Sequence, residues 1–275
     1  MSRPLPRFAV PGAELDVELS DEGGHPVVQL HGLTSSRVRD RLLDLDLGRG
    51  LSGTRLLRYD ARGHGRSAGR AVPEDYRWEV LADDLLRLLD RWFPGERVHG
   101  VGPSMGTGTL LHAALRQPDR FSGLTLLVPP TAWDTRAAKA EDYRRAADLV
   151  EKHGVAAFVR AGRLYPVPPA TSQQPETTPD VPEHLLPALL RGAALTDLPA
   201  RRALAGLSMT VHVLAWVDDP AHPVSTAENL VATLPDCTLD VAHVPADVAA
   251  WPERLMQHVA RSTAAGESPN QVRHG

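Results

Sequence analysis

Short apolar runs alternate with longer stretches of helical periodicity along much of the chain. The apolar runs are nearly continuous, as in strands that are buried on both faces of a sheet. They lie at 27–30, 55–59, 97–101, 121–128, 210–216 and 238–242. The stretches between them repeat apolar residues three or four positions apart, which is the period of an α-helix. This alternation predicts an α/β fold with a doubly wound, mostly parallel sheet covered by helices.

The helical stretches carry start and stop signals. The segment that follows Pro73 places an apolar stripe on one face of a helix and ends before Pro94. The residues of that stripe are Leu81, Leu85, Leu88, Leu89 and Trp92. A helix over 104–116 is stopped by Pro118, and further helices are predicted over 226–234 and 248–260. These helices fill the positions that a parallel sheet needs for its crossover connections.

The alternation is interrupted between residues 129 and 208, where no strand pattern occurs. Four helical stretches and a Pro-rich polar loop take its place, at 137–153, 155–164, 182–195, 198–207 and, for the loop, 166–182. We therefore expect an α/β core of residues 1–130 and 209–261, with a helical cap inserted at 131–208. Residues 262–275 are expected to form a disordered tail.

Composition narrows the possible partners and the compartment. The chain has 275 residues with 30 basic and 34 acidic side chains, a net charge of −4, and its basic residues are scattered. Nucleic acid is therefore not an expected partner. A single cysteine, Cys237, excludes an internal disulfide and fits a reducing compartment. No apolar run approaches the ~18 residues of a membrane helix, and no signal peptide is recognisable. We expect a cytoplasmic protein without a membrane partner, whose oligomeric state the sequence does not indicate.

The motif Gly102-Pro103-Ser104-Met105-Gly106 lies where an apolar strand runs into a helix. In that setting a G-x-S-x-G motif forms a sharp turn that holds the serine hydroxyl out of the sheet. Glycine is needed at both ends because the turn leaves no room for a Cβ atom there. The motif predicts that Ser104 is the nucleophile of an acyl-transfer enzyme.

Together with two further motifs, this turn resembles the α/β-hydrolase superfamily, and within it the branch of enol-lactonases and esterases with a short helical lid. His31-Gly32-Leu33 matches the oxyanion loop of that family, and residues 60–67 match the turn after its next strand. The resemblance runs from about residue 26 to residue 259 outside the cap. It implies an α/β-hydrolase fold in which the N–H groups of Leu33 and Met105 form the oxyanion hole. For His31 and His64 we expect structural roles.

The acid of the expected triad follows from the same resemblance. The segment 213–223 resembles the family's strand-to-loop segment, in which an aspartate precedes a proline by four residues. That pattern implies Asp219 as the acid, with Pro223 as its marker and Asp218 as a solvated neighbour.

The histidine is where the chain departs from the family. The family's histidine lies a few residues beyond the last strand, commonly as Gly-His, and a gap-free match puts Asp247 at that position. His243, four residues earlier, is one candidate if the loop folds differently, and His222 in the acid loop is another. The third interpretation is a site without a triad, because serine and aspartate alone cannot shuttle a proton near neutral pH. The sequence leaves all three open.

We expect a cofactor-independent hydrolase that cleaves a small carboxylic ester or lactone through a serine nucleophile. Its cap would supply apolar walls to the pocket from Trp133, Tyr143, Phe158 and Tyr165. No metal is expected, since the histidines and the cysteine show no zinc spacing. No organic cofactor is expected either, since neither a phosphate loop nor a dinucleotide fingerprint is present.

Two alternatives to hydrolysis follow from the missing Gly-His. One is a non-hydrolytic enzyme on the same fold, such as a lyase, a thioester-acting enzyme or a cofactor-free oxygenase. The other is a non-catalytic ligand-binding protein. Both stay open because a fold does not fix its chemistry.

Overall fold

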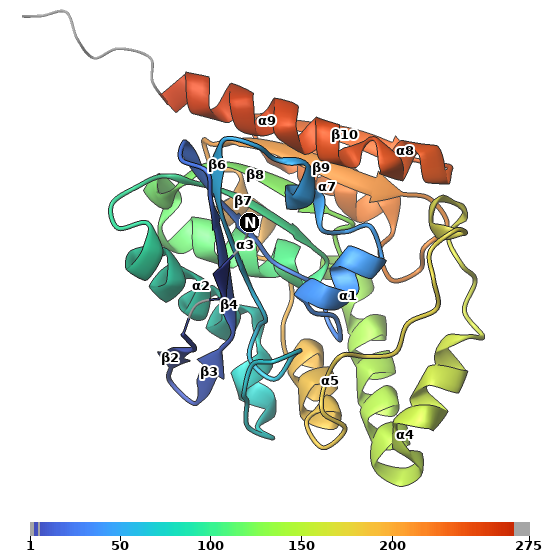
Figure 1. Cartoon of the computed structure of the whole chain (residues 1–275). Coiled ribbons are helices and arrows are strands. Elements are labelled where there is room, and N and C mark those ends of the chain that lie inside the picture. The colour runs from blue at the N-terminus through green and yellow to red at the C-terminus, as the bar shows by residue number, and fades with distance from the viewer. Residues whose placement is uncertain (1–2, 5, 267–275) are drawn as a thin grey trace, which may run out of the picture.

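A central sheet of eight strands organises the chain (Figure 1). The computed structural model describes residues 3–4 and 6–266. In spatial order the strands are β1 (Arg3–Pro4), β4 (Val17–Asp21), β6 (Thr54–Tyr59), β5 (His25–Gln29), β7 (Val98–Pro103), β8 (Phe121–Leu127), β9 (Thr210–Trp216) and β10 (Cys237–Ala242). β4 pairs in antiparallel fashion with both of its neighbours, β1 and β6, and the remaining neighbours are parallel. The predicted doubly wound, mostly parallel sheet is confirmed.

Consecutive residues in the central strands point into two separate cores. Val27 packs on one face of the sheet and Val28 on the other, and the same division separates Leu56 from Leu57. All four side chains are buried. Because side chains alternate across a strand, a strand covered on both faces needs apolar residues at every position. This is why the strands appear as continuous apolar runs in the sequence.

Two layers of helices cover the sheet. The first core packs beneath α2 (Trp78–Trp92), α3 (Met105–Arg116), α6 (Arg201–Leu204) and α7 (Val224–Thr233). The second packs beneath α8 (Pro245–Ala249) and α9 (Trp251–Gly266), which run along the opposite face (Figure 1). The predicted stripe of α2 faces the first core. The short hairpin of β2 (Phe8–Val10) and β3 (Ala13–Leu15) and the helix α1 (Arg37–Leu42) complete the part of the fold before β6.

The segment between β8 and β9 carries helices and no strand among its described residues. α4 (Arg136–Gly162) and α5 (Leu186–Ala194) pack side by side at one end of the molecule (Figure 1). Gly154 interrupts α4 with φ 75° and ψ 171°, so that two helices meet at a kink. Glycine reaches this conformation without the penalty that a Cβ atom brings. The predicted break at Gly154 is confirmed.

The C-terminal helix differs from the prediction. The single helix expected over 248–260 is divided into α8 and α9, with Pro252 in the first turn of α9. α9 continues to Gly266, so the predicted disordered tail is wrong for residues 262–266. The hydroxyl of the buried Ser262 donates to the Val259 carbonyl (3.0 Å) and lies 3.0 Å from Nδ1 of His99, which ties the helix to β7. The remainder of the predicted tail, 267–275, lies outside the described residues.

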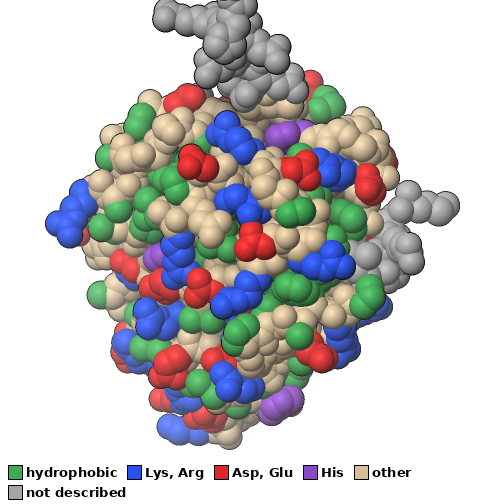
Figure 2. Space-filling model, turned by 90° about the vertical axis from the view of Figure 1, so that its left-hand side faces the viewer, with side chains coloured by type: hydrophobic (Ala, Val, Ile, Leu, Met, Phe, Trp, Pro, Cys, Tyr) green, Lys and Arg blue, Asp and Glu red, His purple; other side chains and the backbone are tan. Residues whose placement is uncertain are grey.

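Charged side chains are interspersed over the surface. On the face shown in Figure 2, lysine and arginine lie among aspartate and glutamate rather than in a patch of one sign. None of the helices in the described part of the chain combines the length and apolar character that a membrane span needs.

Because several histidines are buried, we predict that the protein loses stability in mild acid. Burial lowers the pKa of His31, His64, His99, His212 and His258, for His64 and His258 to about 3. In the unfolded chain these groups bind protons below about pH 6.5, whereas the folded protein keeps them neutral. Each therefore lowers the free energy of unfolding by about 1.4 kcal/mol per pH unit as the pH falls below 6.5. Asp40 acts in the opposite direction, because burial raises its pKa to about 7.

Urea denaturation at pH 7.5 and pH 5.0 measures this effect, and we expect the lower midpoint at pH 5.0. The exposed His153 provides the control, since His153→Gln removes a histidine that folding does not bury. A midpoint at pH 5.0 equal to or above that at pH 7.5 contradicts the prediction.

Candidate active site

Ser104 lies in a strained turn between β7 and α3. Its backbone has φ 50° and ψ −105°, a left-handed conformation that residues other than glycine rarely adopt. A Cβ atom at Gly102 would come within 2.9 Å of the Leu30 Cβ, and one at Gly106 within 3.0 Å of the same atom. The turn is therefore pressed against the end of β5, and the two glycines are required for the close approach predicted from the motif.

The hydroxyl of Ser104 is part of a continuous chain of hydrogen bonds. Oγ of Ser104 lies 2.9 Å from Nε2 of His222, and Nδ1 of that ring lies 2.7 Å from Oδ2 of Asp219. With its hydrogen on Nδ1, the imidazole donates to the carboxylate and Nε2 accepts from the serine hydroxyl. The three side chains thus have the arrangement that a nucleophile, its base and a group orienting the base require.

A tight turn after β9 brings the imidazole onto the carboxylate. The His222 N–H donates to the Asp219 carbonyl (3.1 Å), and the Ala221 N–H donates to Oδ1 of Asp219 (2.8 Å). Pro220 follows the aspartate, and proline favours this position of a turn because its φ is already restricted. Because of this turn, His222 can hydrogen-bond to the carboxylate of Asp219 although only three positions separate the two residues.

Trp216 holds the carboxylate from the other side. Its indole Nε1 donates to Oδ2 of Asp219 (2.8 Å), and its ring stacks on Trp251 of α9 at a centroid distance of 5.8 Å. Burial alone would raise the pKa of Asp219, but the hydrogen bonds from His222, Trp216 and the Ala221 amide hold it below the ordinary value. The carboxylate is therefore ionised at neutral pH, as an acid that stabilises an imidazolium must be. Sequence reasoning missed Trp216, whose only signal was its place at the end of β9.

The other two residues considered for the histidine position lie elsewhere. His243 is exposed, and its backbone N–H donates to Oδ2 of Asp247 (2.8 Å). Asp247 also accepts from the Val244 N–H (3.1 Å) and so caps the short helix α8. The expectation that His243 completes the site, and the interpretation of a site without an imidazole, are both corrected: the ring beside Ser104 is that of His222.

Two backbone amides beside Ser104 are free to bind an anion. A Cβ atom at Gly32 would lie 3.9 Å from the Ser104 Cβ, so the loop of His31–Leu33 passes close to the serine. Within the described chain, the amides of Leu33 and Met105 donate to no protein acceptor. The Met105 amide is the first of α3, where the helix dipole also favours negative charge.

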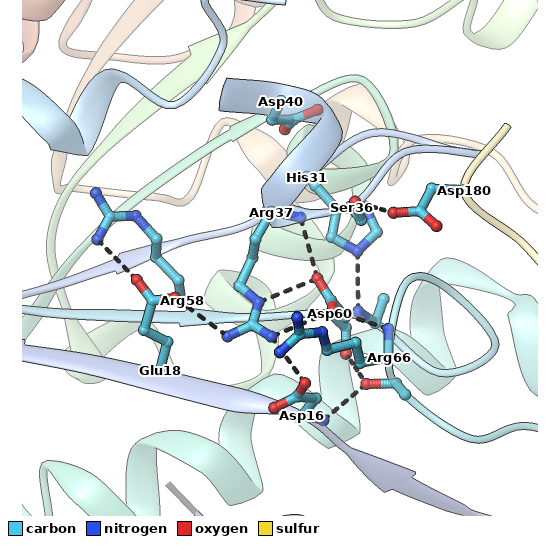
Figure 3. Close-up of polar contacts among 12 residues, drawn as sticks. Asp16, Glu18, His31, Ser36, Arg37, Asp40, Arg58, Asp60, Arg66 and Asp180 are labelled. Carbon is cyan, nitrogen blue, oxygen red and sulfur yellow. Dashed lines mark hydrogen bonds and ion pairs between the residues drawn. The ribbon is translucent and has the colours of Figure 1, made fainter. Parts of the chain in front are cut away.

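A buried polar network supports this loop (Figure 3). Nε2 of His31 accepts from the Ala61 N–H (2.9 Å), and Nδ1 donates to the Gly32 carbonyl (2.8 Å). Asp60 accepts from the side chain and the amide of Arg37. Burial lowers the pKa of His31, which keeps its ring neutral and able to accept from Ala61. The contacts of His31 are those of a residue that shapes the loop.

Asp180 ties the segment after α4 to the same loop. Its carboxylate accepts from the Ser36 hydroxyl (2.5 Å), and its amide donates to the Thr34 carbonyl (2.9 Å). Its own carbonyl accepts from the Gly65 N–H (2.8 Å) in the turn of residues 60–67. Figure 3 shows Asp180 directed toward Ser36. Asp180 therefore joins the Pro-rich loop of the cap segment to two other segments, the one that follows Leu33 and the turn of residues 60–67.

A cavity of about 520 Å³ opens above the serine. Its wall is largely apolar and includes Leu33, Ala146, Leu149, Phe158 and Leu190. Tyr143 and Tyr165 also line it, as predicted, together with three charged residues of α4: Lys139, Asp142 and Arg145. Trp133 does not line it, contrary to the expectation, because its indole donates to the Pro199 carbonyl (3.0 Å) and its ring stacks with Arg201.

Groups of histidine, cysteine, aspartate and glutamate that could hold a metal ion are absent among residues 3–4 and 6–266.

Comparison with known proteins places this geometry in context. A family described as "alpha/beta hydrolase fold" matches residues 25–160. A protein named "Putative carbamate hydrolase RutD" from Caulobacter sp. (strain K31) is 32% identical over 206 residues, which cover 70% of this chain and 73% of that protein. "3-oxoadipate enol-lactonase 2" from Acinetobacter baylyi is 28% identical over 193 residues, 66% of this chain and 68% of that protein.

A solved structure has a similar fold over nearly the whole chain. The enol-lactonase from Burkholderia xenovorans LB400 superimposes with a TM-score of 0.76 and is 21% identical. The match covers 93% of this chain and 100% of that one. At this identity the likeness concerns the fold alone.

Proposed function

The chain belongs to the α/β-hydrolase family, and from that premise we propose that it is a serine hydrolase of small carboxylic esters or lactones that needs no cofactor. One observation carries the proposal: the hydrogen-bonded chain Asp219–His222–Ser104 opens onto a cavity beside two free amides. The cavity suits a small substrate, since about 520 Å³ lies within the range of small-molecule sites.

The first half of the reaction forms an acyl-enzyme. Nε2 of His222 takes the hydroxyl proton of Ser104 while Oγ bonds to the carbonyl carbon of the substrate. The carbonyl oxygen becomes an oxyanion, which accepts from the amides of Leu33 and Met105. The imidazolium, stabilised by Asp219, then gives its proton to the departing alkoxide oxygen as the C–O bond breaks.

The second half restores the serine. A water molecule gives a proton to Nε2 of His222 and bonds to the acyl carbon, and a second oxyanion forms at the same amides. Its collapse breaks the bond to Oγ of Ser104, which takes the proton back from the imidazolium. The sum is an ester and water giving an acid and an alcohol. With a lactone, both groups remain on one product.

We propose that residues 131–208 act as a cap for this chemistry. Tyr143 and Phe158 of α4 and Leu190 of α5 line the cavity, so that the acyl-enzyme is covered by apolar side chains. Excluding bulk water strengthens the interaction of the oxyanion with its amides.

The alternatives without hydrolysis lose their main support. A non-hydrolytic enzyme and a ligand-binding protein were both suggested by the lack of an imidazole for Ser104. His222 supplies that imidazole at 2.9 Å. Every group that ester hydrolysis needs besides substrate and water is then present.

A carbamate is a second candidate substrate, favoured by the name of the Caulobacter relative. Attack on its carbonyl would use the same serine and the same oxyanion hole. The rate of nitrophenolate release from a nitrophenyl ester, compared with the rate from the matching nitrophenyl carbamate, shows which substrate class the enzyme prefers. We expect the ester to be the faster substrate, because nitrogen donation makes the carbamate carbonyl less electrophilic.

Labelling with a fluorophosphonate probe tests the proposed nucleophile. We expect the wild-type protein to become labelled and Ser104→Ala to remain unlabelled, because the probe reacts only with an activated serine. The exposed Ser208 supplies the matched control, and Ser208→Ala should be labelled like the wild type. Labelling of Ser104→Ala to the wild-type extent would exclude the serine mechanism.

A further inference from the structure

Lys139 lies in the wall of the cavity that holds Ser104. It belongs to the first turn of α4 and is half-buried. The chain uses arginine for nearly all of its positive charge, and its other lysine is the exposed Lys152. The ammonium group of Lys139 in this cavity therefore differs from the guanidinium groups that carry nearly all of the chain's positive charge.

The other charged side chains along the cavity already have partners. Asp219 is paired with His222, and Asp142 is paired with Arg145. Lys139 has no carboxylate within ion-pair distance among the described residues. Asp142 and Asp219 act on it only from farther away and favour its charged form, while burial lowers its pKa.

Two tyrosine rings hold the ammonium group in place. Nζ of Lys139 lies 5.4 Å from the centroid of Tyr143 and 5.9 Å from that of Tyr165. Cation–π contacts of this length offset part of the cost of burial, but they use none of the three N–H donors. The neighbouring Arg136 differs, because its guanidinium donates to the carbonyls of Thr196, Thr131 and Ala193. Among the described residues, Nζ of Lys139 thus has no hydrogen-bond acceptor, and the side chain lines the cavity.

We propose that Lys139 determines specificity by binding an anionic group of the substrate, so that the enzyme acts on small esters or lactones that carry a carboxylate. This role of Lys139 rests on the proposed function, because it assumes that the cavity beside Ser104 binds the substrate of the hydrolase. A carboxylate at Nζ supplies the ion pair and the charge-assisted hydrogen bonds that the protein does not. The apolar wall and the serine then receive the rest of the molecule.

Two esters that differ only in the terminal group of the acyl chain test the proposal. Mono-4-nitrophenyl glutarate carries a carboxylate where 4-nitrophenyl pentanoate carries a methyl group. We expect the wild type to prefer the glutarate ester, and Lys139→Met to lower kcat/KM for it by about 10- to 100-fold. The pentanoate ester should change less than about threefold. Lys139→Arg should keep part of the preference, and Lys152→Met, the matched control, should keep all of it.

Binding of glutarate to the Ser104→Ala protein gives a readout that does not depend on catalysis. Calorimetry is expected to show that adding Lys139→Met weakens this binding by about tenfold or more. Equal binding with and without the lysine, or equal losses for both esters, overturns the assignment of Lys139. A different outcome would overturn the proposed function instead. In that outcome the protein binds glutarate through Lys139, hydrolyses neither ester and is not labelled by the fluorophosphonate.

Discussion

Replacing His222 with alanine is expected to lower kcat for a nitrophenyl ester by about 10³-fold, whereas His243→Ala leaves it within about twofold. Nε2 of His222 is the acceptor for the Ser104 hydroxyl at 2.9 Å. In the proposed mechanism its loss removes the general base of acylation and the acid that protonates the leaving group. Steady-state kinetics at pH 7.5 measures the change, with circular dichroism to verify that both variants fold.

His243→Ala is the matched control, because both histidines are near the same edge of the sheet and only one reaches the serine. A His222→Ala protein that keeps more than a tenth of wild-type kcat would remove His222 from the mechanism. Asp247→His in the His222→Ala background should not restore activity, since Asp247 is exposed and its carboxylate caps α8.

Asp219→Asn is expected to lower kcat by about 10²- to 10⁴-fold with little effect on folding. The carboxylate accepts the Nδ1–H of His222. In the proposed mechanism it stabilises the imidazolium that forms during proton transfer. An asparagine amide can instead donate to Nδ1, which moves the ring hydrogen to Nε2 and prevents it from accepting the serine proton. The same kinetic assay measures this change.

Asp218→Asn isolates the role of the carboxylate, because it removes the same charge one residue away. Asp218 is exposed and has φ 61°, a conformation that asparagine tolerates. We expect this variant to retain wild-type kcat. Equal losses in the two variants would mean that net charge near the cavity matters, rather than the orientation of His222.

Much of this molecule follows from short-range patterns in the chain. Apolar runs predicted the strands because burial on both faces demands apolar residues at consecutive positions. Gly102 and Gly106 predicted the turn at Ser104 because no other residue allows the close approach to Leu30. Asp219, Leu33 and Met105 were instead assigned through the resemblance of their loops to motifs of the α/β-hydrolase superfamily.

Contacts between residues far apart in the sequence could not be predicted from those short-range patterns. The break at Gly154 was visible in the sequence, but the docking of Asp180 on Ser36 joins residues 144 positions apart. Trp133 was expected in the cavity from its type alone, yet its indole is bound by Pro199. The helix α9 extends beyond its predicted end because Ser262 contacts His99 on β7.

By itself, the sequence predicted the fold and the turn at Ser104, since these follow from local patterns, and it indicated the loop of Asp219 through the resemblance to a family. Only the tertiary structure decided which imidazole serves the serine. His222 and Ser104 are 118 residues apart, and their contact exists because β7 and β9 end at the same edge of the sheet, on either side of β8. The turn at Pro220 then points the ring of His222 toward the serine, while the loop after β10 directs His243 away into solvent.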